Sequence, residues 1–256
     1  MKILFTICAR AGSKGVKSKN SRLFLDIPIS YYTLTAYNGF LNKYGNQFEV
    51  IQLALNTDSE ELKQQCDDSM LEYVYIPRTE LLGGDRVAKA DVICDTLKKV
   101  EVKTGHEYDF VVDLDLTSPL RTVDDIYGCL NKAIAYKDAN VAYSVTNSRR
   151  QPCFNMVQED GEGYMKIIIP SQYISRQEAP KTYDMNASIY VYRREPLLNT
   201  LNQDVFDGKC VGWIMKDTAV LDIDTEEDYE LMQVLAKYFF EKDSELREIY
   251  NGAIQI

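Results

Sequence analysis

The chain of 256 residues is long enough for one full-sized hydrophobic core, and its 45% hydrophobic content is ordinary for a globular protein. Its formal net charge of −10 excludes the broad basic face that a nucleic-acid or anionic-membrane partner requires. No run of the sequence approaches the about 20 uninterrupted apolar residues of a membrane-spanning helix.

The first predicted element is a buried strand over Lys2–Ala9, whose apolar run ends at Arg10, too early for a signal peptide. Helix starts are marked by Pro28, by Asp58-Ser59 and by a capping box at Thr122. Helix-like segments separate nearly all of the strand-like runs, which predicts one domain over 1–256 with an α/β fold and a doubly wound, mainly parallel sheet. The further strand-like runs are Glu49–Leu55, Leu71–Ile76, Tyr108–Leu114 and Val141–Val145.

The loop after the first strand, ARAGSKGVKSKN at 9–20, is unusually basic for so acidic a chain. Gly12 and Gly15 let backbone N–H groups approach an anion closely, and Ser13 adds a hydroxyl donor. The pattern predicts a polyphosphate site, although it has neither the Walker A spacing nor the three glycines of a dinucleotide loop. A flexible, solvated basic loop is the alternative. The positive charges come from Arg10, Lys14, Lys17 and Lys19.

A second polar segment, DLDLTSPLR at 113–121, ends another predicted strand. Asp113 and Asp115 share one face of that strand, and Thr117-Ser118-Pro119 predicts a turn. These carboxylate and hydroxyl groups suit a polyol or a second metal ligand. In the alternative interpretation the segment is a turn in which Arg121 pairs with a surface acid.

The pattern changes over 149–182, which we expect to be an inserted hairpin subdomain. Alternating runs at Phe154–Glu159 and Tyr164–Ile169 flank the turn signal DGEG at 160–163. The chain then returns to the sheet and closes with a helix from Thr225 to about Glu241. The returning strands are predicted at Ala187–Tyr192, Val211–Lys216 and Val220–Ile223.

The segment LDIDT at 221–225 places two carboxylates on one side of an extended strand. Asp222 and Asp224 could hold Mg²⁺, which prefers oxygen ligands and completes its octahedron with water and substrate phosphate. Alternatively, Asp224 caps the following helix and Asp222 is solvated.

Six scattered cysteines without a Cys-x-x-Cys pair, and the single imidazole of His106, argue against a zinc site. The scatter indicates reduced thiols in a cytoplasmic protein rather than a disulfide framework. The cysteines are Cys8, Cys66, Cys94, Cys129, Cys153 and Cys210.

Taken together and in order, these motifs resemble the cytidylyltransferase family that makes CMP-activated nonulosonic acids, represented by CMP-N-acylneuraminate synthetase. The resemblance covers nearly the whole chain and implies a Rossmann-like nucleotidyltransferase fold. It depends on ARAGSKG and KN within 9–20, NTDS at 56–59, PRTELLGGD at 77–85, LTSPLR at 116–121, SRQ at 175–177, NASIY at 186–190 and DIDTEED at 222–228.

The resemblance implies that the protein transfers CMP from CTP to the anomeric hydroxyl of a nonulosonic acid and releases pyrophosphate, with Mg²⁺ held by Asp222 and Asp224. It also implies that the insertion reaches a second subunit in a homodimer. The implied nucleotide-binding residues are Ala9, Arg10, Gly12, Ser13, Lys14, Lys19, Asn20, Arg78 and Asp85. The implied catalytic residues are Arg10, Lys14, Lys19, Asp222 and Asp224. The implied sugar-binding residues are Asp115, Thr117, Ser118, Arg176, Gln177 and Asn186.

Two departures from the family pattern leave the acceptor open. Asp115-Leu116 stands where sialic acid enzymes usually have Gln-Pro, and Asp184-Met185 stands where they often have Arg-Pro. Sialic, legionaminic, pseudaminic and deaminated nonulosonic acids are all candidates. The rival hypotheses are a cytidylyltransferase for an eight-carbon sugar acid or another small hydroxy acid, a non-catalytic nucleotide-sensing module, and a metal-dependent glycosyltransferase.

Overall fold

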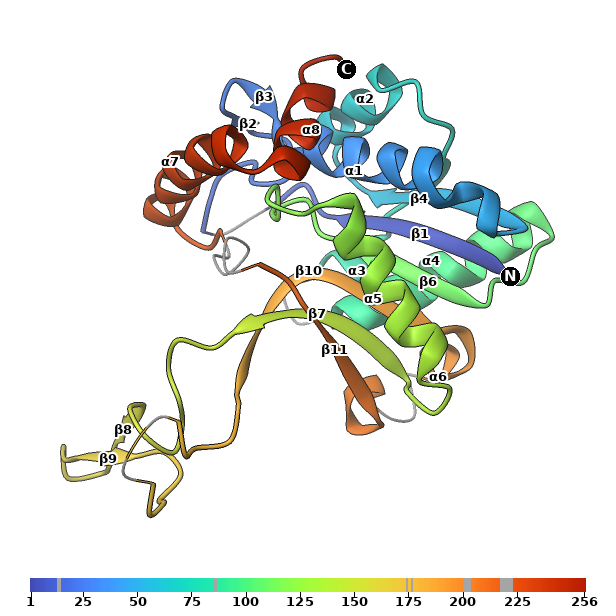
Figure 1. Cartoon of the computed structure of the whole chain (residues 1–256). Coiled ribbons are helices and arrows are strands. Elements are labelled where there is room, and N and C mark those ends of the chain that lie inside the picture. The colour runs from blue at the N-terminus through green and yellow to red at the C-terminus, as the bar shows by residue number, and fades with distance from the viewer. Residues whose placement is uncertain (13–14, 85–86, 174, 176, 200–203, 217–222) are drawn as a thin grey trace.

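The computed structural model describes residues 1–12, 15–84, 87–173, 175, 177–199, 204–216 and 223–256. Its centre is a seven-stranded sheet with the order β11-β7-β10-β6-β1-β4-β5 (Figure 1). β10 runs antiparallel to both of its neighbours, whereas the other neighbouring strands pair in parallel. The prediction of a mainly parallel sheet is therefore confirmed. The strands are β1 (Lys2–Ala9), β4 (Val50–Thr57), β5 (Val74–Pro77), β6 (Phe110–Leu114), β7 (Val141–Asn147), β10 (Tyr183–Arg193) and β11 (Cys210–Ile214).

Three helices begin where local sequence signals predict them. Pro28 precedes α1, Ser59 caps α2, and Thr122 and Asp125 form the capping box of α5. The helices are α1 (Ile29–Tyr44), α2 (Glu60–Asp68), α3 (Glu80–Gly83), α4 (Lys89–Thr104), α5 (Val123–Ala135), α6 (Arg194–Leu198), α7 (Glu226–Lys242) and α8 (Ser244–Ala253). The short elements are β2 (Leu23–Phe24), β3 (Ile27–Pro28), η1 (Gly45–Gln47) and η2 (Val205–Asp207).

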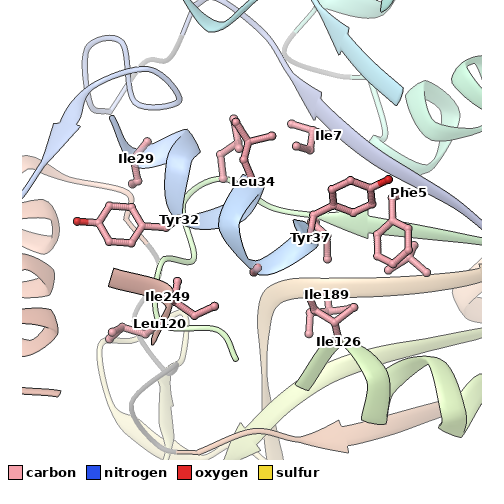
Figure 2. Packing of buried hydrophobic residues seen from close by; sticks show 14 of the residues in the cluster. Phe5, Ile7, Ile29, Tyr32, Leu34, Tyr37, Leu120, Ile126, Ile189 and Ile249 are labelled. Atoms are coloured by element: carbon pink, nitrogen blue, oxygen red, sulfur yellow. The ribbon is translucent and has the colours of Figure 1, made fainter. Parts of the chain in front are cut away.

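Helices cover both faces of the sheet, which is the doubly wound arrangement. Along β1, Phe5 and Ile7 face the core formed with α1, α5, α7 and α8, while Leu4 faces the core formed with α4. This alternation follows from the two-residue period of a strand. Figure 2 shows the larger core, in which the rings of Phe5 and Tyr37 pack edge to face with centroids 5.1 Å apart.

The insertion carries a two-stranded hairpin, β8 (Val157–Glu159) and β9 (Met165–Ile167), as the sequence predicts. Gly163 in its turn has a φ of 88°, a conformation that glycine adopts without steric cost. In Figure 1 the hairpin projects away from the sheet at the end of two long connections, from β7 and into β10.

The strand predicted over Val220–Ile223 differs from the structure at its one described residue. Ile223 is fully buried but belongs to no strand, and residues 220–222 lie outside the described residues. All six cysteines are free thiols. Among the described residues, no helix combines the length and the apolar character needed to cross a lipid bilayer.

Candidate active site

The site lies at the edge of the sheet where β1, β4 and β6 end. The loop over 10–20 follows β1, Asp58 follows β4, and the turn over 115–119 follows β6. Because these three strands are parallel, their carboxyl ends meet at the same edge. Ligands of open α/β sheets bind outside that edge. The loop predicted to bind phosphate therefore stands where the fold places ligand sites.

Hydrogen bonds anchor this loop at both ends. The backbone N–H of Ala11 donates to Oδ1 of Asp58 at 2.7 Å, and the side-chain amide of Asn20 donates to the carbonyl oxygen of Arg10 at 3.1 Å. Gly12 is exposed, and a Cβ built there would meet no atom within 4 Å. The backbone at Gly12 is thus open to a ligand.

The basic loop meets the segment that precedes the C-terminal helices. The Lys19 ammonium donates to the carbonyl oxygen of Ile223 at 2.5 Å and lies 3.6 Å from Oδ1 of Asp224. A Cβ on Gly15 would collide with the carbonyl oxygen of Asp224, so only glycine allows this approach. The described residues of the two motifs therefore converge, although they are about 200 residues apart in sequence. Ser13, Lys14 and Asp222, which the sequence assigns to the same place, lie outside the described residues, as do Asp85 and Arg176.

Asp224 does not cap the helix that follows it. The N-cap of α7 is Thr225, whose hydroxyl accepts from the backbone N–H of Asp228 while Asp228 accepts in return from the N–H of Thr225. The side chain of Asp224 is 78% exposed and faces the Lys19 ammonium. The capping interpretation of Asp224 is therefore wrong, and its carboxylate is available to a ligand.

The donor set suits a cation that is bound mainly by substrate and water. Within the described ranges, no cluster of three or more His, Cys, Asp or Glu side chains could enclose a metal ion. An exposed Asp224 beside a phosphate-type loop fits Mg²⁺ instead, because Mg²⁺ typically uses one or two carboxylates and takes the rest of its ligands from water and phosphate.

Two arginines donate hydrogen bonds to backbone carbonyl groups of helix α3. Arg10 donates through Nη1 to the carbonyl oxygen of Gly83 at 3.3 Å, and Arg78 donates through Nε to that of Leu82 at 3.0 Å. Burial lowers the pKa of the Arg78 guanidinium, which nevertheless stays charged at neutral pH. Arg10 directly follows Ala9, the last residue of β1. Both cations thus border α3 and the segment that leads into α4.

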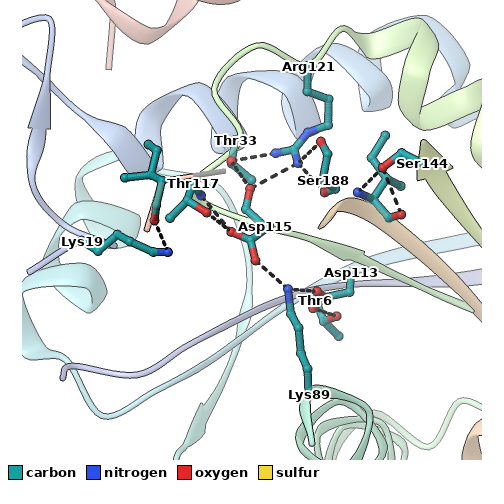
Figure 3. A network of polar contacts seen from close by, with 12 residues as sticks. Thr6, Lys19, Thr33, Lys89, Asp113, Asp115, Thr117, Arg121, Ser144 and Ser188 are labelled. Atoms are coloured by element: carbon teal, nitrogen blue, oxygen red, sulfur yellow. Dashed lines mark hydrogen bonds and ion pairs between the residues drawn. The ribbon is translucent and has the colours of Figure 1, made fainter. Parts of the chain in front are cut away.

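A second charged cluster lies at the end of β6 (Figure 3). The Lys89 ammonium is 2.8 Å from Oδ2 of Asp113 and 2.8 Å from Oδ2 of Asp115. The hydroxyl of Thr6 donates to the other oxygen of Asp113 at 2.8 Å, and Thr117 donates to Oδ1 of Asp115 through both its N–H and its hydroxyl. The ammonium occupies the place between the two carboxyl groups where a second metal ion would have to bind.

The electrostatics of this cluster keep Asp115 and Lys89 charged. Burial opposes the charge on Asp115, yet the neighbouring Lys89 ammonium and the Thr117 donors hold the pKa of its carboxyl well below the usual range. Burial likewise opposes the charge on Lys89, but Asp113 and Asp115 raise the pKa of its ammonium well above the ordinary value. At neutral pH Asp115 and Lys89 therefore form a charged pair.

Arg121 does not pair with a surface acid, so the alternative interpretation of this segment is wrong. The side chain is only 1% exposed, and burial lowers its pKa to about 10. Nη2 donates to the hydroxyl of Thr33 at 2.7 Å, while Nη1 donates to the carbonyl oxygens of Ser188 at 2.7 Å and Asp115 at 3.2 Å. Arg121 thereby fastens the turn after β6 to helix α1 and strand β10.

The other described residues that were predicted to bind the sugar lie on different elements of the fold. Asn186 is 3% exposed, and its amide accepts from the hydroxyl of Ser144 at 2.6 Å and contacts the sulfur of Met215 at 3.3 Å. It lies where the register of β10 shifts, between Met185 and Tyr190. Ser118 is half-buried in the turn after β6, and Gln177 is exposed on the projecting insertion. The sugar-binding roles of these residues stay predictions.

Neither a role for Lys89 nor the burial of Arg121 was predicted from the sequence. Lys89 is the first residue of α4, where a positive charge opposes the helix dipole. A lysine at a helix start calls for nearby carboxylates, and that local signal could have identified Lys89. Arg121 offered no comparable signal, since its partners Thr33 and Ser188 are 88 and 67 residues away.

Comparison with known proteins gives matches over nearly the whole chain. The chain is 36% identical over 244 residues to the post-translational flagellin modification protein B of Campylobacter coli, covering 92% of this chain and 95% of that protein. It is 36% identical over 235 residues to a CMP-N,N'-diacetyllegionaminic acid synthase of Campylobacter jejuni subsp. jejuni, covering 91% and 94%. No protein-family model matches the chain.

Among solved structures, the fold is similar to that of a CMP:2-keto-3-deoxy-manno-octonic acid synthetase complexed with CTP. The TM-score is 0.63 at 18% sequence identity, over 93% of this chain and 99% of that chain. At this identity the match bears on the fold alone.

Proposed function

Because the chain belongs to the family of cytidylyltransferases that form CMP-activated nonulosonic acids, we propose that it transfers CMP from CTP to the anomeric hydroxyl of a nonulosonic acid and releases pyrophosphate. One observation carries the proposal for the site: Lys19, Gly15 and Asp224 meet at the carboxyl edge of the sheet. At that edge the lysine ammonium suits a triphosphate, and the aspartate carboxylate suits the cation bound to it.

The chain's own residues bind and orient the nucleotide. Arg10 and Lys19, together with the backbone at Gly12, hold the phosphates and stabilise the charge that builds on them as pyrophosphate leaves. Asn20 binds the ribose, and Arg78 frames the cytosine with the segment that leads into α4. The exposed Asp224 carboxylate is one of the groups that would hold Mg²⁺, which when bound neutralises phosphate charge. By family resemblance Ala9, Ser13, Lys14, Asp85 and Asp222 complete this half of the site.

The acceptor is bound on the β6 side of the same edge. Asp115, Thr117 and Ser118 face the sugar in this proposal, with Arg176, Gln177 and Asn186 assigned to it by resemblance. We infer a legionaminic acid type of acceptor, since a relative that makes CMP-N,N'-diacetyllegionaminic acid is 36% identical over 91% of this chain. An eight-carbon sugar acid is the rival candidate, which the acceptor panel described below separates from nonulosonic acids.

The insertion supports a homodimer. It exposes an apolar surface that a monomer would leave in water, and a hollow of about 610 Å³ lies at its base, lined in part by Met156, Tyr183, Met185 and Ile214. A second copy covering this surface would bring the insertion of one subunit to the site of the other. The exposed apolar residues of the insertion are Phe154, Met156, Val157, Tyr164, Met165, Ile168, Ile169 and Tyr173.

We expect light scattering after gel filtration to give about twice the 29.4 kDa mass of one chain. The double variant Tyr164→Asp, Met165→Asp should elute as a monomer, because burying two carboxylates in an apolar interface is unfavourable. Val102→Asp is the control, since Val102 is 86% exposed on α4 and outside the insertion. A monomeric wild type, or a dimeric double variant, would contradict the assignment of this surface.

The reaction itself is tested by pyrophosphate release from CTP with a panel of acceptors. We expect N,N'-diacetyllegionaminic acid to give the highest kcat/KM, followed by sialic and pseudaminic acids, with little turnover of eight-carbon acids. CTP binding without pyrophosphate release from any acceptor would instead indicate a nucleotide-sensing module. Transfer of the sugar of an already activated nucleotide sugar would indicate a glycosyltransferase.

We also place the protein in the cytoplasm, where its six free thiols stay reduced.

A further inference from the structure

Lys89 holds a position that its own helix makes unfavourable. It is the first residue of α4, where the partial positive charge of the helix N-terminus repels an ammonium group. Two carboxylates from the end of β6 offset this repulsion, each 2.8 Å from Nζ. The placement therefore depends on Asp113 and Asp115, and their geometry depends in turn on Lys89.

The two carboxylates have different surroundings. Asp113 is fully buried and is fixed by the hydroxyl of Thr6. Asp115 sits at the start of the turn, where Thr117 holds one of its oxygens and Lys89 the other. Asp115 is thus held at two points, so that its carboxylate plane is fixed while part of the side chain stays open to solvent.

Lys89 is also accessible to a ligand. Its side chain is 35% exposed, and Nζ lies 5.7 Å from the centroid of the Tyr190 ring. The same side chain borders a hollow of about 320 Å³ that Tyr190, Tyr192 and Phe206 line on one side. An ammonium has three N–H donors: one donates to Oδ2 of Asp115, and the ion pair with Asp113 takes at most a second. The third remains for a group that enters from this side.

We propose that Lys89 is a specificity-determining residue of the acceptor site, where it fixes Asp115 in a single orientation and supplies a hydrogen-bond donor beside it. The inference rests on the proposed function, since it places the acceptor next to Asp115. A fixed carboxylate next to an ammonium donor suits neutral groups that both donate and accept hydrogen bonds, such as the hydroxyl and acylamino groups of the sugar. It disfavours a second anionic group, because a single ammonium already faces two carboxyl groups.

The test is the variant Lys89→Met, which keeps the length of the side chain and removes its charge. We expect the acceptor KM to rise by about tenfold or more, because Asp115 loses its orientation and the donor is lost, while the CTP KM stays within about twofold. Lys99→Met is the matched control, since Lys99 lies on the same helix and pairs with Asp95 rather than with the carboxyl groups of β6. It should change neither constant.

A pH profile separates this role from a merely structural one. Without Lys89, the burial of Asp115 and the nearby Asp113 would raise the pKa of the Asp115 carboxyl, so kcat/KM for the acceptor should fall as the pH is lowered toward 5. The wild type should show no such fall, since its Asp115 stays ionised there. The other charged or titratable groups around the cluster are Cys8, Arg78, Arg121, Tyr190 and Tyr192.

The variant Lys89→Arg provides a second test that remains usable if Lys89→Met fails to fold. Because it keeps the positive charge, it should retain the wild-type pH profile and raise the acceptor KM less than Lys89→Met does. Equal increases of the CTP and acceptor KM values, or an unchanged acceptor KM in both variants, would overturn the inference. If the wild type releases no pyrophosphate with any acceptor, the proposed function fails instead, so the two failures are distinguishable.

Discussion

Replacing Lys19 with methionine is expected to lower kcat by about a hundredfold, or about 2.7 kcal/mol of transition-state stabilisation. Lys19 is the described cation that joins the loop after β1 to Ile223 and Asp224. Its charge lies where the triphosphate must approach the acidic segment. Methionine keeps the bulk of the side chain, so the variant removes the charge and little of the packing. Steady-state pyrophosphate release at saturating CTP and acceptor measures the effect.

Lys63→Met is the control for the loss of one positive charge elsewhere on the protein. Lys63 lies on α2 and pairs with Asp67 at 3.0 Å on the surface, so its loss should leave kcat within about twofold. A kcat near that of the wild type for Lys19→Met would remove the main support for the assigned site. An equal loss in both variants would point to an effect of overall charge rather than of position.

Removal of divalent metal with EDTA is expected to abolish pyrophosphate release, and added Mg²⁺ should restore it. The physical reason is that a triphosphate bound beside Asp224 brings several negative charges together, and Lys19 and Arg10 alone do not balance them. In Asp224→Asn we expect half-maximal activity to need at least about tenfold more Mg²⁺, since an amide is a weaker ligand than a carboxylate.

Asp138→Asn serves as the control for this titration. Asp138 is an exposed carboxylate that pairs with Lys209 on another part of the surface, so its Mg²⁺ requirement should equal that of the wild type. Full activity in EDTA would show that metal has no part in the reaction. An unchanged Mg²⁺ requirement in Asp224→Asn would exclude this carboxylate as a ligand.

Local patterns were enough to predict most of the sheet and the starts of the helices. The run over Lys2–Ala9 is apolar and is β1, and the capping box at Thr122 begins α5 as expected. These features depend on residues within a few positions of one another. The sequence also predicted that the basic loop meets the segment before α7, because both motifs suit one phosphate ligand. The described residues of the two motifs do converge.

Features that depend on distant partners were not predictable in the same way. The alternating run in β10 shows that a strand is present but not its direction, which is antiparallel to both neighbours. Arg121 stands in what the sequence indicates is a turn, and it is buried because Thr33 and Ser188 accept its hydrogen bonds. Asp115 was expected to face a ligand, yet its pairing with Lys89 required the fold to bring α4 to β6.

Strand β10 has a structural consequence for the proposed dimer. It begins at Tyr183, directly after the insertion, and passes through a register shift between Met185 and Tyr190 that includes Ser188, which Arg121 ties to the backbone of Asp115. One strand therefore connects the insertion to the turn that carries Asp115. In the proposed dimer, a subunit that docks on the insertion would contact the same strand that borders the proposed acceptor side of the site.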